Sequence, residues 1–322
     1  MLNNDLRSFL FTGKLEISLL ISVVSFYETS KNRIILLGAS NLTLSLRLVT
    51  HLMQQRFGRP SEILAAVGHG RAYGSANQVL LRGLPGIAAS GLWPQLNSAE
   101  VHPTYALLTD IGNDILFGSA PEQILRQVEW CVEQLQMQSA QVVVTNLPMA
   151  SIEDLSERRY KFYRNIFYPF CRLPRNETVS RVRAVYQGLI DMASRRNFTL
   201  YEQEPVWFGP DGIHVHYWKR RAFYRDILEQ FPLRSDRQGG ADESLDQAPS
   251  MVRQAHHERD PHFVVRPELV EGLSQNFHPD KKEWLLTWQQ RPKFAYKTLL
   301  GREIHCQQPS GRLADGSSVY KY

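Results

Sequence analysis

The chain has 322 residues, of which 43% are hydrophobic and 21% charged, with a formal net charge of +5. This composition is typical of a globular protein and excludes a collagen-like, disulfide-stapled or wholly disordered chain. The 37 basic residues are interleaved with 32 acidic ones, so the charge permits contact with nucleic acid or an anionic membrane without arguing for either.

Two features of the sequence bear on the compartment. The cysteines Cys131, Cys171 and Cys306 are far apart and form no CxxC pair, so no zinc site or disulfide framework is encoded locally and a cytoplasmic location is expected. The apolar run LEISLLISVVSF at residues 15–26 is shorter than the roughly 20 residues of a membrane span. No small-residue cleavage pattern follows it, so secretion by an atypical signal is the alternative.

Short β-rich runs alternate with helical patterns from residue 33 to residue 231. Strands are predicted at 33–38, 62–68, 104–112, 140–148 and 198–202, and helices at 42–58, 121–137, 179–196 and 215–231. The first run, RIILLG, has consecutive apolar residues, as in a strand buried on both faces of a parallel sheet. The alternation therefore predicts a three-layer α/β/α sandwich with a mostly parallel sheet, in one domain of residues 33–231.

The flanking segments are predicted to be appendages to this domain. Residues 1–32 form an N-terminal extension, and residues 232–280 are polar and aperiodic, as in a disordered or loop-like insertion. Part of that insertion, VRQAHHERDPHFVVRPELVEGL, resembles the translation of a bacterial intergenic palindromic repeat. Residues 281–322 regain aromatic, turn and strand residues, so this irregular extension is expected to pack back on the core.

Polar residues follow two of the predicted strands, at the edge where open α/β sheets bind ligands. Ser40, in GASN, follows the first strand at the start of a helix, whose free N–H groups could stabilise an oxyanion. Asn113, in DIGND, follows the third strand, and its amide could complete an oxyanion hole. Taken separately, the serine could merely cap its helix and the asparagine could belong to an ordinary turn.

The motif PDGIHVH precedes the last predicted helix. Its carboxylate at Asp211 and imidazole at His214 are three residues apart, so the carboxylate could fix the histidine tautomer and leave the other ring nitrogen to take a proton from a serine. A glycine turn followed by a surface histidine is the alternative. His216 adds an HxH pair, but no third ligand pattern lies nearby, so no metal site is predicted.

The serine, the glycine-rich loop GHGRAYG, the asparagine and DGIH follow successive strand ends in one order. In this the chain resembles the SGNH hydrolase superfamily, the GDSL esterases and lipases, over residues 33–231. The resemblance implies a flavodoxin-like α/β/α fold with Ser40 as nucleophile, His214 as base and Asp211 as acid. It also implies that no metal or organic cofactor is needed.

By the same resemblance, the oxyanion would be held by the Ser40 N–H, the Asn113 amide and a glycine of the second loop. Gly74 is the better match for that glycine, and Gly70 is the reserve. The chain departs from the family pattern at Ala39, where an aspartate is usual, and in the second loop, which lacks the usual asparagine. Arg71 stands in that loop and is predicted to bind a substrate carboxylate or phosphate through its planar guanidinium.

One stretch, ERRYKFYRNIFYPFCRLPRN, alternates aromatic residues from Tyr160 to Phe170 with Arg and Lys. A helix and turn packing aromatics on the sheet would explain it. A lid or substrate wall over the site is an alternative, as are contact with a lipid headgroup layer and stacking on single-stranded nucleic acid.

Together these patterns predict a serine esterase that hydrolyses an acyl ester through an acyl-enzyme. The expected substrate is a small-molecule, lipid or carbohydrate ester, and neither a nucleic-acid partner nor a stable membrane span is expected. An acyltransferase acting on a sugar or lipid would use the same residues, and a catalytically silent binding module would keep only the fold. The acyl length and the oligomeric state are left open.

Overall fold

The computed structural model describes residues 32–79, 81–98, 102–232 and 287–322, which are built around an eight-stranded sheet. The strand order is β7-β6-β5-β1-β2-β12-β11-β8. Six neighbouring strands run parallel: β7 (Thr199–Tyr201), β6 (Gln141–Thr145), β5 (Thr104–Leu108), β1 (Asn32–Gly38), β2 (Ser61–Val67) and β12 (Ser318–Lys321). Beyond β12, β11 (Gly311–Leu313) pairs antiparallel with β12 and with the edge strand β8 (Trp288–Gln290).

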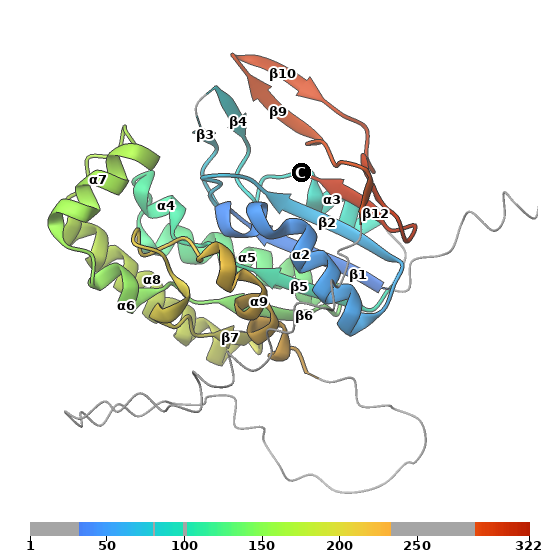
Figure 1. Cartoon of the computed structure of the whole chain (residues 1–322), viewed down its shortest axis with the longest axis horizontal. Helices are drawn as coiled ribbons and strands as arrows, with labels where there is room; N and C mark the ends of the chain where they lie inside the picture. Colours follow the sequence, from blue (N-terminus) through green and yellow to red (C-terminus); the bar gives the residue numbers. More distant parts are fainter. Residues whose placement is uncertain (1–31, 80, 99–101, 233–286) are drawn as a thin grey trace, which may run out of the picture. The chain divides into compact units, whose positions relative to one another are not determined.

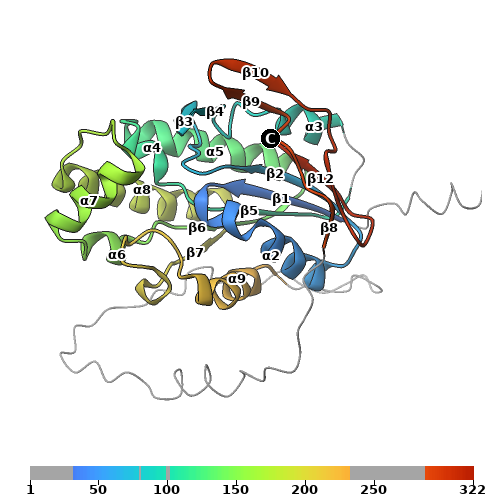
Figure 2. The same ribbon diagram turned by 45° about the horizontal axis from the view of Figure 1, so that its top comes forward.

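Helices cover both faces of the sheet (Figures 1 and 2). One face packs against α2 (Ser40–Phe57) and α9 (Arg220–Glu229), and the other against α3 (Leu92–Ser98), α5 (Pro121–Met137) and α8 (Arg175–Arg196). Strand β1 shows why both faces are apolar: Ile34 and Leu36 enter one core, while Ile35 and Leu37 enter the other. The predicted three-layer α/β/α sandwich is confirmed.

Helix α5 shows how the sequence builds one of the outer layers. Pro121 occupies the first turn, where its missing N–H costs nothing. The buried positions Ile124, Val128, Cys131, Val132 and Leu135 then recur with helical spacing on the face that meets the sheet. Helix α8 packs beside α5 on the same face, and it begins at Arg175, four residues before the predicted start.

Shorter elements gather around the carboxyl edge of the parallel strands. They are β3 (Asn77–Val79), β4 (Arg82–Leu84), α4 (Asn113–Leu116), α6 (Met149–Glu153), α7 (Glu157–Phe167) and the 3-10 turns η1 (Pro205–Trp207) and η2 (Tyr217–Lys219). The helix predicted at 215–231 is shorter, because Val215 forms an isolated antiparallel bridge with Phe208 and α9 starts only at Arg220. The DGIH motif lies in the turn between these two bridged residues.

The described part of the C-terminal segment, residues 287–322, is built of strands. Strand β12 lies parallel to β2 and continues the main sheet. Two further strands, β9 (Tyr296–Leu299) and β10 (Arg302–His305), join β4 and β3 in a separate antiparallel sheet of order β10-β9-β4-β3. The sandwich is therefore completed by residues far along the chain from its other strands.

Other predictions concern residues outside the described ranges. The apolar run at 15–26 and the segment that resembles a palindromic repeat both lie there. Within the part that the structure describes, no helix combines the length and the apolar character needed to cross a bilayer.

Candidate active site

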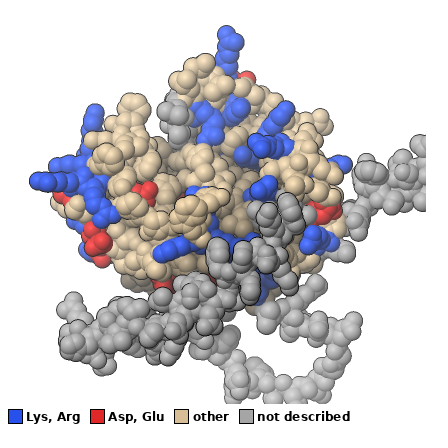
Figure 3. All heavy atoms as spheres, viewed as in Figure 1, with Lys and Arg blue, Asp and Glu red and all other residues tan. Residues whose placement is uncertain are grey.

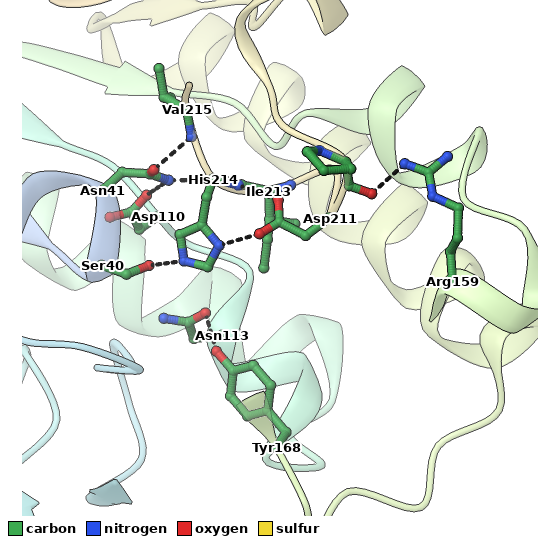
Figure 4. Close-up of polar contacts among 11 residues, drawn as sticks. Ser40, Asn41, Asp110, Asn113, Arg159, Tyr168, Asp211, Ile213, His214 and Val215 are labelled. Carbon is green, nitrogen blue, oxygen red and sulfur yellow. Dashed lines mark hydrogen bonds and ion pairs between the residues drawn. The ribbon is translucent and has the colours of Figure 1, made fainter. Parts of the chain in front are cut away.

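The predicted polar residues meet at the carboxyl edge of the sheet (Figure 4). Ser40 is the first residue of α2, two positions after β1 ends at Gly38, and Asn113 begins α4 after β5. The loop between η1 and η2 brings Asp211 and His214 to the same place. This is the edge at which parallel α/β sheets present loops and helix N-termini to ligands.

Three side chains form a continuous hydrogen-bonded chain. The Ser40 Oγ lies 2.8 Å from His214 Nε2, and His214 Nδ1 lies 2.6 Å from Asp211 Oδ2. The second carboxylate oxygen of Asp211 accepts the backbone N–H groups of Ile213 and His214 at 3.1 and 2.9 Å. The carboxylate thus holds both the ring and the backbone of the histidine, which fixes Nε2 toward the serine.

The ionisation of Asp211 agrees with this role as an acceptor. Burial alone would raise the pKa of its carboxyl group, but the hydrogen bonds from the His214 ring and from the two backbone N–H groups outweigh burial and lower the pKa. The group is therefore a carboxylate at neutral pH, when it can accept a proton-bearing Nδ1.

Ser40 does not cap its own helix. The N-cap position of α2 is Ala39, and no side chain of that residue or of Ser40 takes the capping role. Instead Asp110 Oδ2 accepts the N–H groups of Ala39 at 2.8 Å and Leu42 at 3.3 Å. A carboxylate at a helix N-terminus is favourable, and it leaves the Ser40 hydroxyl to His214.

Asn41 joins the helix to the loop that carries the histidine. Its Nδ2 donates to Asp110 Oδ1 and to the Ile213 carbonyl, both at 2.9 Å, and its Oδ1 accepts the Val215 N–H at 2.9 Å. Asp110 itself adopts a left-handed conformation, with φ of 58°, which Asp tolerates better than most residues. The hydrogen bonds of Asn41 to Ile213 and Val215 therefore hold the backbone on both sides of His214.

The amide of Asn113 is fixed from two directions. Its Nδ2 donates to the Arg71 carbonyl at 2.8 Å, and its Oδ1 accepts the Tyr168 hydroxyl at 2.6 Å. Burial, together with the nearby Asp110 and Asp114, raises the pKa of Tyr168, so the phenol stays a neutral donor. One Nδ2 hydrogen remains, and Figure 4 shows the amide nitrogen facing the space beside Ser40.

Gly74 is a correction to the prediction. Its backbone N–H donates to Asp114 Oδ1 at 3.0 Å, and the same carboxylate also takes the N–H groups of Tyr73 and Ser75. Gly74 is therefore committed to shaping the second loop, and it does not line the cavity at the site. Gly70, the reserve, turns the chain with φ of 64° and does not line that cavity either.

Arg71 is also corrected. Its side chain is fully buried and donates to the carbonyls of Val67, Pro85 and Tyr322. Burial and the charge of Arg82 lower the pKa of Arg71 to about 9, so it still carries its charge at neutral pH. The guanidinium links the second loop to the end of β12 and does not line the cavity at the site, while the Arg71 carbonyl accepts from Asn113.

An apolar cavity opens beside Ser40 and Asn113. Its walls come from the strand ends and from α6, α7 and α8, and they include Ile111, Ile115, Leu147, Leu155 and Val182. Tyr160 and Tyr163 of α7 face into it, and Phe167 at the end of that helix packs edge-on against the His214 ring, with 5.2 Å between centroids. The cavity suits an apolar group of a ligand bound beside Ser40.

The next question is whether side chains near the site could bind a metal ion. Among the described residues, no group of three or more His, Cys, Asp or Glu side chains is arranged to bind one. Neighbouring His216 belongs to no such group.

Several residues at the site were not predicted from the sequence. Asn41, Asp110 and Asp114 lie inside the two motifs that were singled out, but strand-end patterns do not reveal which carboxylate faces which backbone group. Tyr168 stands in the aromatic stretch, 55 residues from Asn113. Only the tertiary packing of the segment after α7 brings it to the amide.

Comparisons with known proteins find solved structures that are similar to this chain at low sequence identity. No family model matches the chain, and no curated protein does. Among solved structures, the esterase EstA from Pseudoalteromonas sp. is similar at 14% identity and a TM-score of 0.39, covering 62% of this chain and 96% of its own. The aryl esterase of M. smegmatis is similar at 15% identity and a TM-score of 0.43, and the match covers 62% of this chain and 100% of that esterase.

A member of the lipolytic G-D-S-L family from Veillonella parvula is similar at 13% identity and a TM-score of 0.37, covering 62% of this chain and 94% of its own. All three TM-scores are below 0.5, so the functional assignment below is built on the geometry of the site.

Proposed function

We propose that this protein is a serine esterase. The observation that carries the proposal is the chain of hydrogen bonds from Ser40 Oγ to His214 Nε2 at 2.8 Å and from His214 Nδ1 to Asp211 at 2.6 Å. A hydroxyl, an imidazole and a carboxylate in this order form an activated nucleophile, because the imidazole can take the serine proton and the carboxylate stabilises the resulting imidazolium.

In the proposed reaction, Ser40 Oγ attacks the ester carbonyl carbon while His214 Nε2 accepts the hydroxyl proton. The tetrahedral intermediate collapses as the imidazolium returns that proton to the leaving alcohol, which gives an acyl-serine. Water then attacks the acyl carbon with His214 again as base, releasing the carboxylic acid and the free serine.

The negative charge on the carbonyl oxygen needs donors that are fixed in advance. The Asn113 amide has one hydrogen left after its bond to the Arg71 carbonyl. The Ser40 N–H lies in the first turn of α2, where backbone donors have no partner within the helix. These two groups are the proposed oxyanion hole, without a contribution from Gly74.

The apolar cavity supports an uncharged acyl group. Ile111, Leu147 and Val182 would contact such a group, and the buried Arg71 offers no charge to an anionic one. Arg164 is the basic residue of the lining, and its guanidinium donates to the Leu173 carbonyl and to Asn165. Acyl transfer to an alcohol would use the same residues and differs in whether water or another hydroxyl attacks the acyl-serine. The order of the three side chains argues against a silent binding module.

The test is hydrolysis of p-nitrophenyl acetate and labelling by a fluorophosphonate. Ser40→Ala should lose at least about a thousandfold in kcat/KM and should not be labelled. Ser180→Ala, which changes an exposed serine of α8, should behave as the wild type. Equal turnover by wild type and Ser40→Ala would sink the proposal, and product analysis with an added alcohol separates hydrolysis from acyl transfer.

A further inference from the structure

Helix α7 carries large apolar side chains on its outer face as well as its inner one. Tyr160 and Tyr163 point into the cavity. On the outer side, Phe162 is 60% exposed and Ile166 is 55% exposed, and Phe170, just beyond the helix, is 91% exposed. The cavity accounts for the inner residues, whereas these three exposed residues do not line it.

The three exposed residues, Phe162, Ile166 and Phe170, are called the α7 patch below. Phe162 and Ile166 are four residues apart, so they lie one above the other on the same helix face. Arg158 lies one turn before Phe162 on that face and is exposed. An apolar stripe that continues into basic residues is the arrangement of helices that lie at a lipid–water interface.

The segment around the patch is strongly basic. Residues 156–175 contain one acidic residue, Glu157, and six basic ones: Arg158, Arg159, Lys161, Arg164, Arg172 and Arg175. Figure 3 shows the same surface, where Lys and Arg side chains gather at the end of the molecule that α7 forms in Figure 1. An excess of positive charge there attracts an anionic partner.

Most of this charge is not neutralised by carboxylates of the described residues. Arg159 donates to the Pro210 carbonyl, Arg164 to the Leu173 carbonyl and Asn165, and Arg175 to the carbonyls of Leu155 and Glu153. These acceptors hold the side chains and leave the positive charges in place. Lys161 does pair with Glu157, at 3.2 Å on the surface, where such a pair is weak.

We propose that the α7 patch and its basic side chains dock this protein on an anionic lipid surface. Apolar side chains would enter the boundary between headgroups and acyl chains, while Arg and Lys contact the phosphates. Because the inner face of α7 lines the cavity beside Ser40, docking would bring a lipid ester to its mouth. That last step rests on the proposed esterase function, whereas the docking itself does not.

Two other occupants fit the observations less well. A second copy of this chain, related by a two-fold axis, would set the same six basic residues of each copy near one another, which like charges disfavour. Single-stranded nucleic acid would suit aromatic rings in a basic groove, but Ile166 offers no ring to stack on and the exposed face is that of a convex helix.

The experiment measures binding of the full-length Ser40→Ala protein, which separates docking from catalysis. The protein is sedimented with vesicles of phosphatidylcholine alone or mixed with phosphatidylglycerol, at low and high salt. We expect binding to the mixed vesicles, weaker binding in high salt, and little binding to phosphatidylcholine alone.

Two variants test the two parts of the surface. Phe162→Ser with Ile166→Ser should weaken binding about tenfold or more, because two large apolar side chains no longer leave water. Arg158→Glu should weaken it by more than about fivefold, since each basic residue near an anionic surface contributes about that factor. Met137→Ser and Arg195→Glu, at exposed positions of α5 and α8, are the matched controls and should bind as the parent does.

The same changes are made with Ser40 intact to keep the two proposals apart. Hydrolysis of soluble p-nitrophenyl acetate by the Phe162→Ser, Ile166→Ser variant should match the wild type, because neither side chain lines the cavity. The docking proposal is overturned if the parent does not bind anionic vesicles or if the variants bind as well as the controls. It is also overturned if the patch changes instead dissociate a dimer in light scattering or abolish binding to an oligonucleotide.

Discussion

The hydroxyl of Tyr168 decides which way the Asn113 amide points. A side-chain amide can be turned by half a rotation with little change in shape, but Oδ1 accepts the phenol at 2.6 Å while Nδ2 donates to the Arg71 carbonyl. Reversing the amide would place its NH2 against the phenol and its oxygen against a carbonyl. Tyr168 is thus a positioning residue for the proposed oxyanion donor.

Tyr168→Phe should lower kcat about tenfold with little change in KM, because the substrate still binds while the amide loses its fixed orientation. Removal of an entire oxyanion donor costs more, about a hundredfold to a thousandfold. Steady-state kinetics with p-nitrophenyl acetate measure both constants. Tyr163→Phe removes a hydroxyl from the same cavity without touching Asn113, and an equal loss there would contradict the positioning role.

Asp211→Asn should remove most of the activity, about a thousandfold to ten-thousandfold, because an amide cannot hold the histidine in the required tautomer. It should also change the pH dependence of stability. The pKa of Asp211 is lowered in the folded state, so the carboxylate stabilises the fold above the ordinary pKa of an aspartate and loses that contribution as pH falls through the lowered value.

Chemical denaturation of both proteins over a pH series measures this effect. The difference in unfolding free energy should be largest near neutral pH and should shrink in acid. A difference that stays constant down to the most acidic conditions would show that Asp211 acts through packing alone.

At this scale, the sequence singles out four residues that lie together in the structure. Ser40, Asn113, Asp211 and His214 could be singled out because each follows a strand end or stands in a short motif. Arg71 could not, because a loop arginine is usually solvated, and its burial depends on carbonyls contributed by β2, Pro85 and Tyr322. The same limit applies to Gly74, whose N–H orientation is set by Asp114.

At the scale of elements, Asn41 connects the start of α2 with the loop before α9. Its three hydrogen bonds reach Asp110, Ile213 and Val215, and it is only 7% exposed. Ser40 and His214 are 174 residues apart in the chain, so their 2.8 Å contact depends on how these two elements are held together.

Asn41→Ala should lower the unfolding free energy by about 2 to 4 kcal/mol, because buried polar groups on both segments lose their partners. Activity should fall further than stability explains, measured well below the melting temperature, since the His214 loop is no longer tied to the helix. Asn176→Ala, at an exposed position in the first turn of α8, is the control. Full activity in a folded Asn41→Ala protein would argue against this function.

Strand β12 continues the main sheet beside β2. Val319 is fully buried in the core between the sheet and α2, and without β12 the strand β2 would present an unpaired, apolar edge. The aromatic and strand-like residues of this segment predicted that it packs on the core. Its register beside β2 could not be predicted, because a short alternating pattern does not indicate which strand a segment pairs with or in which direction it runs.

Val319→Asp should destabilise the protein by more than about 3 kcal/mol, because it buries an unpaired charge. Thermal unfolding measures the loss, and poor solubility would be the accompanying sign of an exposed β2 edge. Ile304→Asp changes a half-exposed residue of β10 and should cost much less. Equal melting temperatures for the two variants would mean that β12 is dispensable for the core.

At the scale of the whole molecule, the described core consists of two stretches of sequence, residues 32–232 and 287–322. The second stretch supplies β12, β11 and β8 to the main sheet and two strands to the smaller one. The alternating pattern of residues 33–231 was enough to predict the layers, because buried strands and amphipathic helices take turns along the chain there. It could not predict that a later stretch would extend the sheet.

Two separately expressed fragments, residues 1–232 and residues 287–322, should therefore reassemble. The larger fragment alone should be poorly soluble, since the edge of β2 is uncovered, and co-expression should restore soluble protein and p-nitrophenyl acetate hydrolysis. Copurification through a tag on the small fragment measures the association. A soluble, active large fragment would contradict the expectation.

The long separation of β12 from β2 also governs how the protein reaches its folded state. The Ser61 N–H and the Gln54 amide both donate to Ser317 Oγ, across 256 and 263 residues of chain. Contacts of such high sequence separation slow folding, and a chain made from its N-terminus cannot form them until residue 317 has been added. The growing polypeptide must keep an apolar strand edge from aggregating throughout that time, so chaperone binding during translation is expected at β2.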